Sequence, residues 1–156
     1  MLSIVIPAYN ESENLSNTVE SLYGELNRNG IIHEILVIND HSTDNTEDVL
    51  CYLKAKTPSL IYLNNKMSGG FGNAIRYGLN NFKGDYVAIF MADLSDDPKD
   101  LISFYQLAVE ENLDAVFGSR FIKGGGVYDY PKLKLTLNRL FNWIVRIVFR
   151  SKYNDF

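Results

Sequence analysis

Carboxylates cluster after an apolar run in the second half of the chain, where they could bind a cation. Asp93 follows the run at 86–91, and Asp96 and Asp97 come shortly after it. Carboxylate oxygens are the ligands that Mg²⁺ and Mn²⁺ prefer, and an ion held there keeps coordination positions open for a diphosphate. Asp96 and Asp97 can instead cap a helix that begins at Pro98. Asp93 stands too early for that cap, so we interpret it as a metal or substrate ligand.

Two more charged side chains stand at the ends of apolar runs. Asp40 follows the run at 35–38, where its carboxylate can accept hydrogen bonds from a ribose or a base edge, or order its own loop as an Asx turn. Arg120 follows the run at 115–117, where its guanidinium can bind a diphosphate with two parallel hydrogen bonds, or form a surface ion pair. Both residues therefore join Asp93 as candidates for binding a phosphorylated ligand.

A glycine-rich turn precedes a predicted helix at 73–82. Gly69, Gly70 and Gly72 could cradle an anion at the N-terminus of that helix. Ile75 stands where a dinucleotide-binding fingerprint needs its third glycine, so a tight turn that permits close packing explains these glycines better.

Short apolar runs alternate with helix-forming segments along most of the chain. The predicted strands are 2–6, 35–38, 60–63, 86–91 and 115–117. A predicted helix follows each of the first four, and Ser12 or Asn14 can cap the helix over 15–26. Crossovers of this length favour parallel pairing, and continuous apolar runs indicate strands covered on both faces. We therefore predict an α/β, Rossmann-like fold with a mostly parallel central sheet, whose ligands bind beyond the carboxyl ends of the strands.

Composition bounds the class of protein. Apolar residues make up 46% and charged residues 22% of the 156 residues, as in an ordinary globular domain. The net charge of −4 argues against nucleic-acid binding, and no apolar run is long enough to cross a membrane. Cys51 is the only cysteine, which excludes an internal disulfide and favours a reducing compartment. The N-terminus has no basic segment before its apolar run, so we expect no secretory signal.

The C-terminal segment differs in charge from the rest of the chain. Six Lys or Arg side chains and no acid lie between Lys132 and Lys152, which leaves −10 for all other residues. On a helical wheel the apolar side chains gather on one face and the basic ones on the other. This pattern is typical of a helix in a membrane interface, and equally of a helix packed on its own domain with a solvated basic side. In both cases it indicates a localised anionic partner.

Taken together, these loops resemble the family 2 glycosyltransferases of GT-A fold. The matching segments are Pro-Ala-Tyr-Asn-Glu at 7–11, Asn-Asp-His-Ser-Thr-Asp at 39–44, the glycine turn at 69–72, Ala-Asp-Leu-Ser at 92–95 and Gly-Ser-Arg-Phe at 118–121. Pro98, and Gly-Gly-Gly-Val-Tyr at 124–128 before a basic helix with Asn138 and Arg139, look most like dolichol-phosphate mannose synthases and related polyprenyl-phosphate glycosyltransferases. The resemblance covers essentially the whole chain.

The resemblance implies roles for the matched residues. It places the following residues in a nucleotide-sugar pocket: Pro7, Tyr9, Glu11, Asp40, Gly72 and Ala92. Of these, Asp40 would contact the base or the ribose. Asp93 would also contact the donor and act as the metal-binding acid, with Ser95 as a second ligand of Mg²⁺ or Mn²⁺. Arg120 would face the donor diphosphate, and Arg139 would face the acceptor phosphate. Asp93, Arg120 and Arg139 are therefore the expected catalytic residues.

The implied activity is transfer of a hexose to a polyprenyl or dolichyl phosphate, with inversion and with help from a divalent ion. Mannose from GDP-mannose is the best assignment of the donor, and UDP-glucose or a saccharide acceptor is the alternative. The implied partners are a nucleotide-sugar donor, a polyprenyl phosphate and a membrane surface, which predicts a peripheral protein at the cytoplasmic face of a membrane. We expect residues 1–123 to bind the nucleotide sugar, and 124–156 to form the acceptor and membrane side of the same domain.

Three departures from the family pattern bear on activity. Met91 stands where the family usually has the first acid of Asp-Ala-Asp. Asn39 replaces the first acid of Asp-Asp-Gly-Ser, and His41 replaces its glycine. Family members normally continue past the point matched by Phe156, so the chain resembles a family member truncated at its C-terminus. These departures support an alternative function, that of a catalytically impaired or truncated nucleotide-binding domain.

Overall fold

The computed structural model describes residues 1–119 and 131–150 of the chain. The chain forms two compact units, Met1–Asp114 and Ala115–Phe156. The first unit contains the sheet and four helices, and the second contains one long helix. The domain boundary that the sequence predicts between residues 123 and 124 lies outside the described residues.

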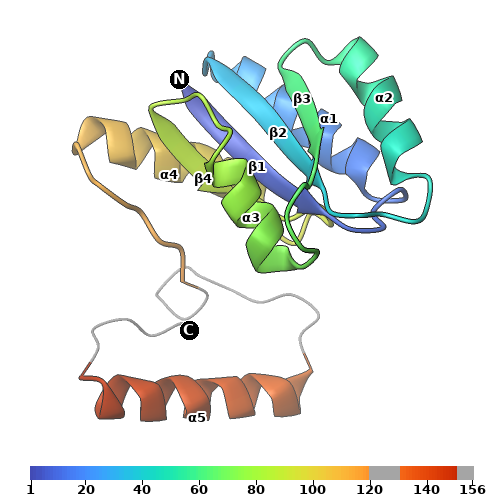
Figure 1. Ribbon diagram of the computed structural model, residues 1–156. Coiled ribbons are helices and arrows are strands. Elements are labelled where there is room, and N and C mark those ends of the chain that lie inside the picture. Colours follow the sequence, from blue (N-terminus) through green and yellow to red (C-terminus); the bar gives the residue numbers. More distant parts are fainter. Residues whose placement is uncertain (120–130, 151–156) are drawn as a thin grey trace. The chain divides into compact units, whose positions relative to one another are not determined.

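The first unit is built on a four-stranded parallel sheet (Figure 1). Its strands are β1 (Leu2–Ala8), β2 (His33–Asn39), β3 (Leu60–Asn64) and β4 (Tyr86–Ile89), in the spatial order β3-β2-β1-β4. Every neighbouring pair is parallel, so the carboxyl ends of all four strands lie along one edge, here called the carboxyl edge. The predicted parallel α/β sheet is thereby confirmed for its first four strands.

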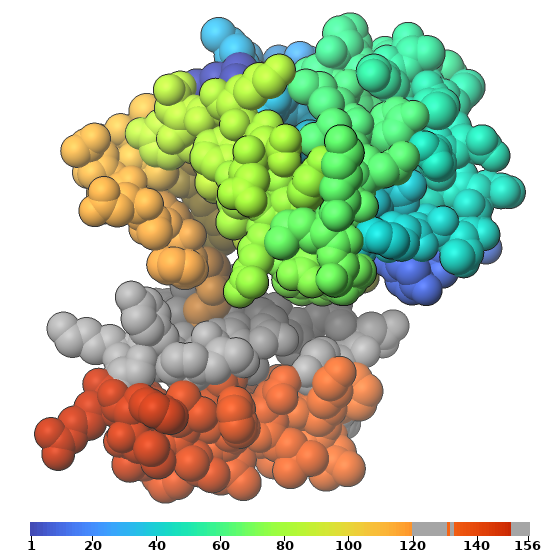
Figure 2. All heavy atoms as spheres, viewed as in Figure 1, coloured from blue at the N-terminus to red at the C-terminus, as the bar shows by residue number. Residues whose placement is uncertain are grey.

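Helices cover both faces of this sheet. They are α1 (Leu15–Arg28), α2 (Thr46–Lys56), α3 (Phe71–Leu79) and α4 (Pro98–Glu110). On one face, Ala74 of α3 packs with Val5 and Ile38, and Figure 2 shows the atoms of α3 over that face. On the other face, α1, α2 and α4 contribute Leu22, Leu50 and Ile102 to the larger core. Because both faces are covered, β1 and β2 read as continuous apolar runs, as expected.

The prediction of a fifth strand over 115–117 is wrong. Residues 115–117 do not form a strand, and 76% of the surface of Phe117 is exposed. An apolar run of three residues is at the short limit of strand length. Several predicted boundaries also move by one to three residues; β4, for example, ends two residues early, at Ile89, and α3 begins two residues early, at Phe71.

The start of α4 follows the expectation from sequence. Pro98 occupies the first turn, and the carboxylate of Asp97 accepts a hydrogen bond from the N–H of Lys99 at 2.9 Å. Asp96 does not cap this helix, because its carboxylate accepts the N–H of Met91 at 2.9 Å. Asp97 therefore has the structural role that the sequence allowed for both acids, and Asp96 orders the segment just before it.

Asn14 is the residue at the start of α1, as predicted, but its side chain does not cap the helix. Its amide instead donates to the carboxylate of Glu11 at 3.0 Å. The alternative cap, Ser12, is wrong as well, because α1 begins at Leu15 and Ser12 lies before the N-cap position.

Pro7 explains where β1 and β4 separate. Their pairing ends at Val5 and Ile89, and the carbonyl of Val5 accepts the N–H of Phe90 at 3.0 Å. The next β1 residue whose N–H would point toward β4 is Pro7, which has no N–H to donate. The chain after β4 is therefore released from the sheet at the carboxyl edge.

The second unit contains α5 (Lys132–Val148), so the predicted basic helix forms. Many of its large apolar side chains are exposed: Leu133, Leu137, Leu140, Phe141, Trp143, Ile144, Ile147 and Val148. Among the described residues, no helix is long and apolar enough to cross a membrane.

Candidate functional site

Strained backbone marks the carboxyl edge. Asn10, His41 and Leu94 follow β1, β2 and β4, and each has a left-handed backbone with φ of 56°, 62° and 56°. Gly70 lies between β3 and α3 at φ 125°, a conformation that favours glycine. Left-handed backbone at other residues costs free energy and persists where neighbouring contacts hold it. The loops of this edge are therefore held by specific interactions.

The loops after β1 and β2 are joined by side chains that bond to backbone. The carboxamide oxygen of Asn10 accepts the N–H of Thr43 at 2.8 Å, and the N–H of Asn10 donates to the hydroxyl of Ser42 at 3.0 Å. These reciprocal bonds link residues more than 30 positions apart in the sequence. They also account for the left-handed backbone of Asn10, since its amide bridges the two loops.

Asp44 is the centre of the same junction. Its two carboxylate oxygens accept the N–H of Ser12 at 3.2 Å and the N–H of Thr46, the first residue of α2, at 3.0 Å, while Asn45 stands at the N-cap position of that helix. The buried hydroxyl of Thr46 donates to Asp44 at 2.5 Å and accepts the N–H of Glu11 at 2.9 Å. Hydrogen bonds from Ser12 and Thr46 hold the pKa of Asp44 well below its ordinary value.

Asp44→Asn is expected to weaken the acid dependence of stability. The pKa of Asp44 is lower in the folded state than in the unfolded state. The ionised carboxylate therefore contributes its full share of folding stability above the unfolded pKa of about 4, and this contribution is lost as the pH falls further. We expect the variant to be less stable than the wild type at pH 7 and to lose less of its stability between pH 4 and pH 2. Urea unfolding across this range measures both effects. Asp114→Asn is the control and should follow the wild-type curve; an Asp44 variant that does so too would contradict the assignment.

Asp40 lies at the carboxyl edge with its carboxylate buried, only 5% of the residue being exposed. One oxygen accepts the amide of Asn65 at 2.7 Å, and the other accepts the N–H of Gly70 at 2.7 Å. His41 lies beside it, with Nδ1 3.5 Å from the first oxygen. Asp40 therefore has a structural role, but it orders the loop between β3 and α3 and not its own loop, as the predicted Asx turn would have done.

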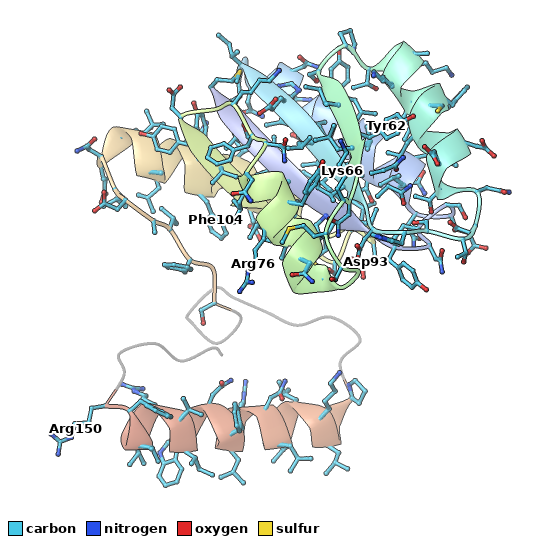
Figure 3. All side chains as sticks on the ribbon, viewed as in Figure 1. Tyr62, Lys66, Arg76, Asp93, Phe104 and Arg150 are labelled. Atoms are coloured by element: carbon cyan, nitrogen blue, oxygen red, sulfur yellow. The ribbon has the colours of Figure 1, made fainter. Side chains whose placement is uncertain are left out.

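Asp93 lies on the connection that follows β4, where Figure 3 labels it. Its side chain is exposed, and one carboxylate oxygen accepts the N–H of Ser95 at 3.0 Å. Hydrogen bonds from the backbone and the hydroxyl of Ser95 lower the pKa of Asp93, which keeps the carboxylate charged near neutral pH. β2 and β4 flank β1, so the strands that lead to Asp40 and Asp93 run roughly 10 Å apart, two strand spacings, and β4 ends three residues earlier than β2 along β1.

The structure places the other predicted pocket residues at this edge in different environments. Tyr9 is exposed and follows β1, whereas Pro7 is buried within that strand. Ala92 is 3% exposed and contributes to the core, so only its backbone is near the edge. Gly72 is exposed in the first turn of α3, with open space where a Cβ would stand.

Neither of the two predicted arginines is among the described residues of the first unit. Arg120 lies outside the described residues, and Arg139 belongs to α5 in the second unit. The loops after β1 and β2 are bonded to each other, and Asp40 bonds to the loop after β3. The structure therefore brings Tyr9, Glu11 and Asp40 together on connected loops.

Two residues at this edge escaped the sequence analysis. Asn65 holds Asp40, and no local pattern distinguishes it from other loop asparagines. Thr18 donates its hydroxyl to the carbonyl of Ala92 at 2.6 Å. A signal for Thr18 does exist, because it is a polar residue within the buried stripe of α1 that otherwise consists of Leu15, Val19 and further leucines.

A depression of about 400 Å³ lies elsewhere, at the amino end of the sheet. Tyr23, His33, Pro58 and Ser59 are among its lining residues. The ring nitrogens of His33 already contact the carbonyl of Ile31 at 2.7 Å and the hydroxyl of Ser59 at 2.9 Å. His33 at the start of β2 is therefore a structural residue, and the chemistry-bearing side chains lie at the opposite edge.

An ion at Asp93 would have few protein ligands. Within the described residues no group of three or more His, Cys, Asp or Glu side chains could hold a metal. Asp93 and Ser95 offer a charged carboxylate and a hydroxyl, which are hard oxygen donors of the kind that Mg²⁺ and Mn²⁺ accept. This donor set fits an ion that takes its remaining ligands from a diphosphate and from water.

Solved structures share the fold of the chain. A mannosyltransferase from Pyrobaculum calidifontis, in complex with GDP-Man and Mn²⁺, is similar over 69% of this chain and 32% of its own, with 22% identity and a TM-score of 0.59. TarS 1–349 from S. aureus, in complex with UDP-GlcNAc, is similar over 78% of this chain and 38% of its own, with 19% identity and a TM-score of 0.60. At these identities the likeness shows the fold, which confirms the predicted GT-A class.

The sequence comparison goes further. A dolichol-phosphate mannosyltransferase from Pyrococcus furiosus is 32% identical over 130 residues, which cover 83% of this chain and 36% of the relative. The chain spans between a quarter and little more than a third of the length of the curated relatives that it matches. The family described as glycosyl transferase family 2 matches residues 3–155. The chain therefore belongs to glycosyl transferase family 2.

Proposed function

We propose that this protein transfers a hexose from a nucleoside-diphosphate sugar to a polyprenyl phosphate. The observation that carries the proposal is the exposed, charged Asp93 at the carboxyl edge of a GT-A sheet, in a chain of glycosyl transferase family 2. Mannose from GDP-mannose is the proposed donor. The 32% identical relative is named a dolichol-phosphate mannosyltransferase, and one solved structure of the same fold holds GDP-Man and Mn²⁺.

The proposed donor pocket lies along the loops of the carboxyl edge. Exposed Tyr9 and half-buried Glu11 are held in place by the junction with the loop after β2. Gly72 leaves open space at the start of α3, where exposed N–H groups can bind an anion. Asp40 already accepts two internal hydrogen bonds, but carboxylate oxygens have further lone pairs with which to accept a ribose or base donor. Pro7 and Ala92 shape this pocket through the backbone that they fix.

Asp93 and Ser95 are the residues that would hold Mg²⁺ or Mn²⁺. A bound divalent ion would supply positive charge to the departing diphosphate. The lowered pKa of Asp93 suits this role, because the carboxylate is charged at neutral pH without help from the ion. Arg120 is the proposed second source of positive charge at the diphosphate.

Transfer needs no strong general base in this proposal. The bond between the anomeric carbon and the diphosphate oxygen breaks, and the nucleoside diphosphate leaves with its electron pair. An oxygen of the acceptor phosphate forms the new bond from the opposite face, which inverts the anomeric centre. Because that phosphate is already ionised near pH 7, no side chain has to remove its proton. Arg139, on the basic α5, is the proposed contact of the acceptor phosphate.

Calorimetry tests the donor class directly. GDP and UDP are titrated separately into the full chain, each with and without Mn²⁺. We expect GDP to bind more tightly than UDP, by about tenfold or more, and more tightly with Mn²⁺ than without it. Tighter binding of UDP would favour a UDP-glucose donor instead, and binding of neither nucleotide would refute the proposed function.

A membrane surface is the proposed location of the acceptor. Exposed apolar side chains and several basic ones share α5, a pattern that suits the headgroup region of an anionic bilayer. We accordingly propose a peripheral protein at the cytoplasmic face of a membrane. Sedimentation with vesicles tests this location: the chain should pellet with anionic vesicles and remain in solution with neutral ones, and a failure to pellet with either would refute it.

Two replacements favour a second candidate function, a nucleotide-binding domain without turnover. Met91 offers no carboxylate before Asp93, and its N–H is bonded to Asp96. The amide of Asn39 donates to Asn64 at 2.9 Å, so this position is occupied by a contact within the sheet edge. Release of nucleoside diphosphate from GDP-mannose in the presence of a polyprenyl phosphate separates the two candidates, because only the enzyme produces it.

A further inference from the structure

The segment 91–97, which carries Asp93, is linked to distant parts of the described chain by one hydrogen bond, here called the tether. β4 ends at Ile89, and Phe90 makes the last backbone bond to β1. Beyond it, the bonds of the segment are local ones, such as Met91 to Asp96 and Asp93 to Ser95. Among the described residues, the bond between Thr18 and Ala92 is the only hydrogen bond that links this segment to a distant element.

That tether is buried and short. Thr18 is fully buried on α1, and its hydroxyl lies 2.6 Å from the carbonyl oxygen of Ala92 across 74 positions of sequence. The same hydroxyl is 3.2 Å from the carbonyl of Asn14, within its own helix. A hydroxyl has one proton to donate, and the shorter distance indicates that Ala92 receives it. The bond to Ala92 is therefore the main interaction of this side chain.

The tether acts on the peptide unit that leads into Asp93. The side chain of Ala92 lies in the core, and its carbonyl is held by Thr18, so this peptide plane is restrained at both ends. Asp93 is the next residue, and the backbone of Leu94, which follows it, is in the left-handed conformation. The direction of the Asp93 side chain depends on this plane, which the hydroxyl of Thr18 restrains through the carbonyl of Ala92.

We propose that Thr18 is a positioning residue for Asp93, and that its hydroxyl is required for metal-dependent binding of the donor. This inference rests on the proposed function, in which Asp93 holds the ion. Groups that orient a metal ligand from behind typically change metal affinity by about 10- to 100-fold when they are removed. Thr18 comes from α1, far from Asp93 in sequence, and it contributes no ligand of its own.

A graded series of variants tests the proposal. Thr18→Val keeps the shape and removes the hydroxyl, Thr18→Ser keeps the hydroxyl, and Thr18→Cys offers only a weak donor. The measured quantity is the ratio of GDP dissociation constants without and with Mn²⁺, from calorimetry on the full chain. We expect the ratio to fall at least about tenfold for valine, to fall partly for cysteine, and to stay near the wild-type value for serine. GDP binding without metal should change little across the series.

Thermal unfolding of the same variants excludes a merely structural effect. If Thr18→Val does not fold, the comparison of Thr18→Ser with Thr18→Cys still measures the role of the hydroxyl. If the ratio of GDP dissociation constants is unchanged in Thr18→Val, the proposal is overturned while the proposed function stands. If Thr18→Val does not fold, an unchanged ratio in Thr18→Cys has the same meaning. A wild-type chain whose GDP affinity ignores Mn²⁺ overturns the metal assignment and this inference together. Equal losses with and without metal would show a general loss of folded protein and would also overturn the role of Thr18.

Discussion

Asp93→Ala is expected to abolish measurable sugar transfer, a loss of about 100-fold or more, with at most a small decrease in the thermal stability of the chain. The side chain is exposed, and its hydrogen bond in the structure is the local one to the N–H of Ser95. Little packing is therefore lost with it. What disappears is a carboxylate that stays charged near neutral pH and that we assign to the metal at the donor diphosphate. Transfer from GDP-mannose to a polyprenyl phosphate measures the activity, and thermal unfolding measures the stability.

Two matched variants separate charge from loop structure. Asp93→Asn keeps an oxygen that can accept the N–H of Ser95 but loses the charge, so it should be as inactive as the alanine variant. Asp97→Ala removes the cap of α4, which should lower stability by about 0.5–2 kcal/mol and leave transfer intact at temperatures where the variant is folded. Wild-type transfer by Asp93→Asn would show that the charge at this position is not used.

Gly78→Ala is expected to lower the free energy of unfolding by about 1–3 kcal/mol, although alanine favours helices. Gly78 is buried in α3, where the helix lies against the sheet. An added Cβ would stand 2.3 Å from Cγ1 of Val5 and 3.3 Å from Cγ1 of Ile38. Both neighbours are buried and branched at Cβ, so they cannot turn away without disturbing the core. Urea unfolding followed by circular dichroism measures the change.

Gly24→Ala is the matched control for this prediction. Gly24 is also inside a helix, α1, but no atom lies within 4 Å of an added Cβ. The same substitution should therefore raise the free energy of unfolding there, by about 0.5–1 kcal/mol, because alanine restricts the unfolded chain and favours the helix. The two substitutions should have opposite signs. A Gly78 variant as stable as the Gly24 variant would mean that α3 packs less closely than the structure shows.

The sequence by itself determined the class of fold and the place of the site. Continuous apolar runs at β1 and β2 indicated strands that are buried on both faces, and the alternation of strands with helices indicated that the strands pair in parallel. Parallel strands put their carboxyl ends on one edge, so Asp40 and Asp93 were expected there from their positions alone. Local patterns also located the start of α4, since Pro98 and Asp97 act within one turn of helix. These features were readable because each depends on neighbours in sequence.

Only the tertiary structure decided which polar side chains are already engaged. Asp40 bonds to Asn65 and Gly70, and Thr18 bonds to Ala92, across 25 to 74 positions of sequence. Distances of this kind depend on how α1 and the loops pack against the sheet. The residue types along the chain supply the donors and acceptors, and packing selects which of them meet.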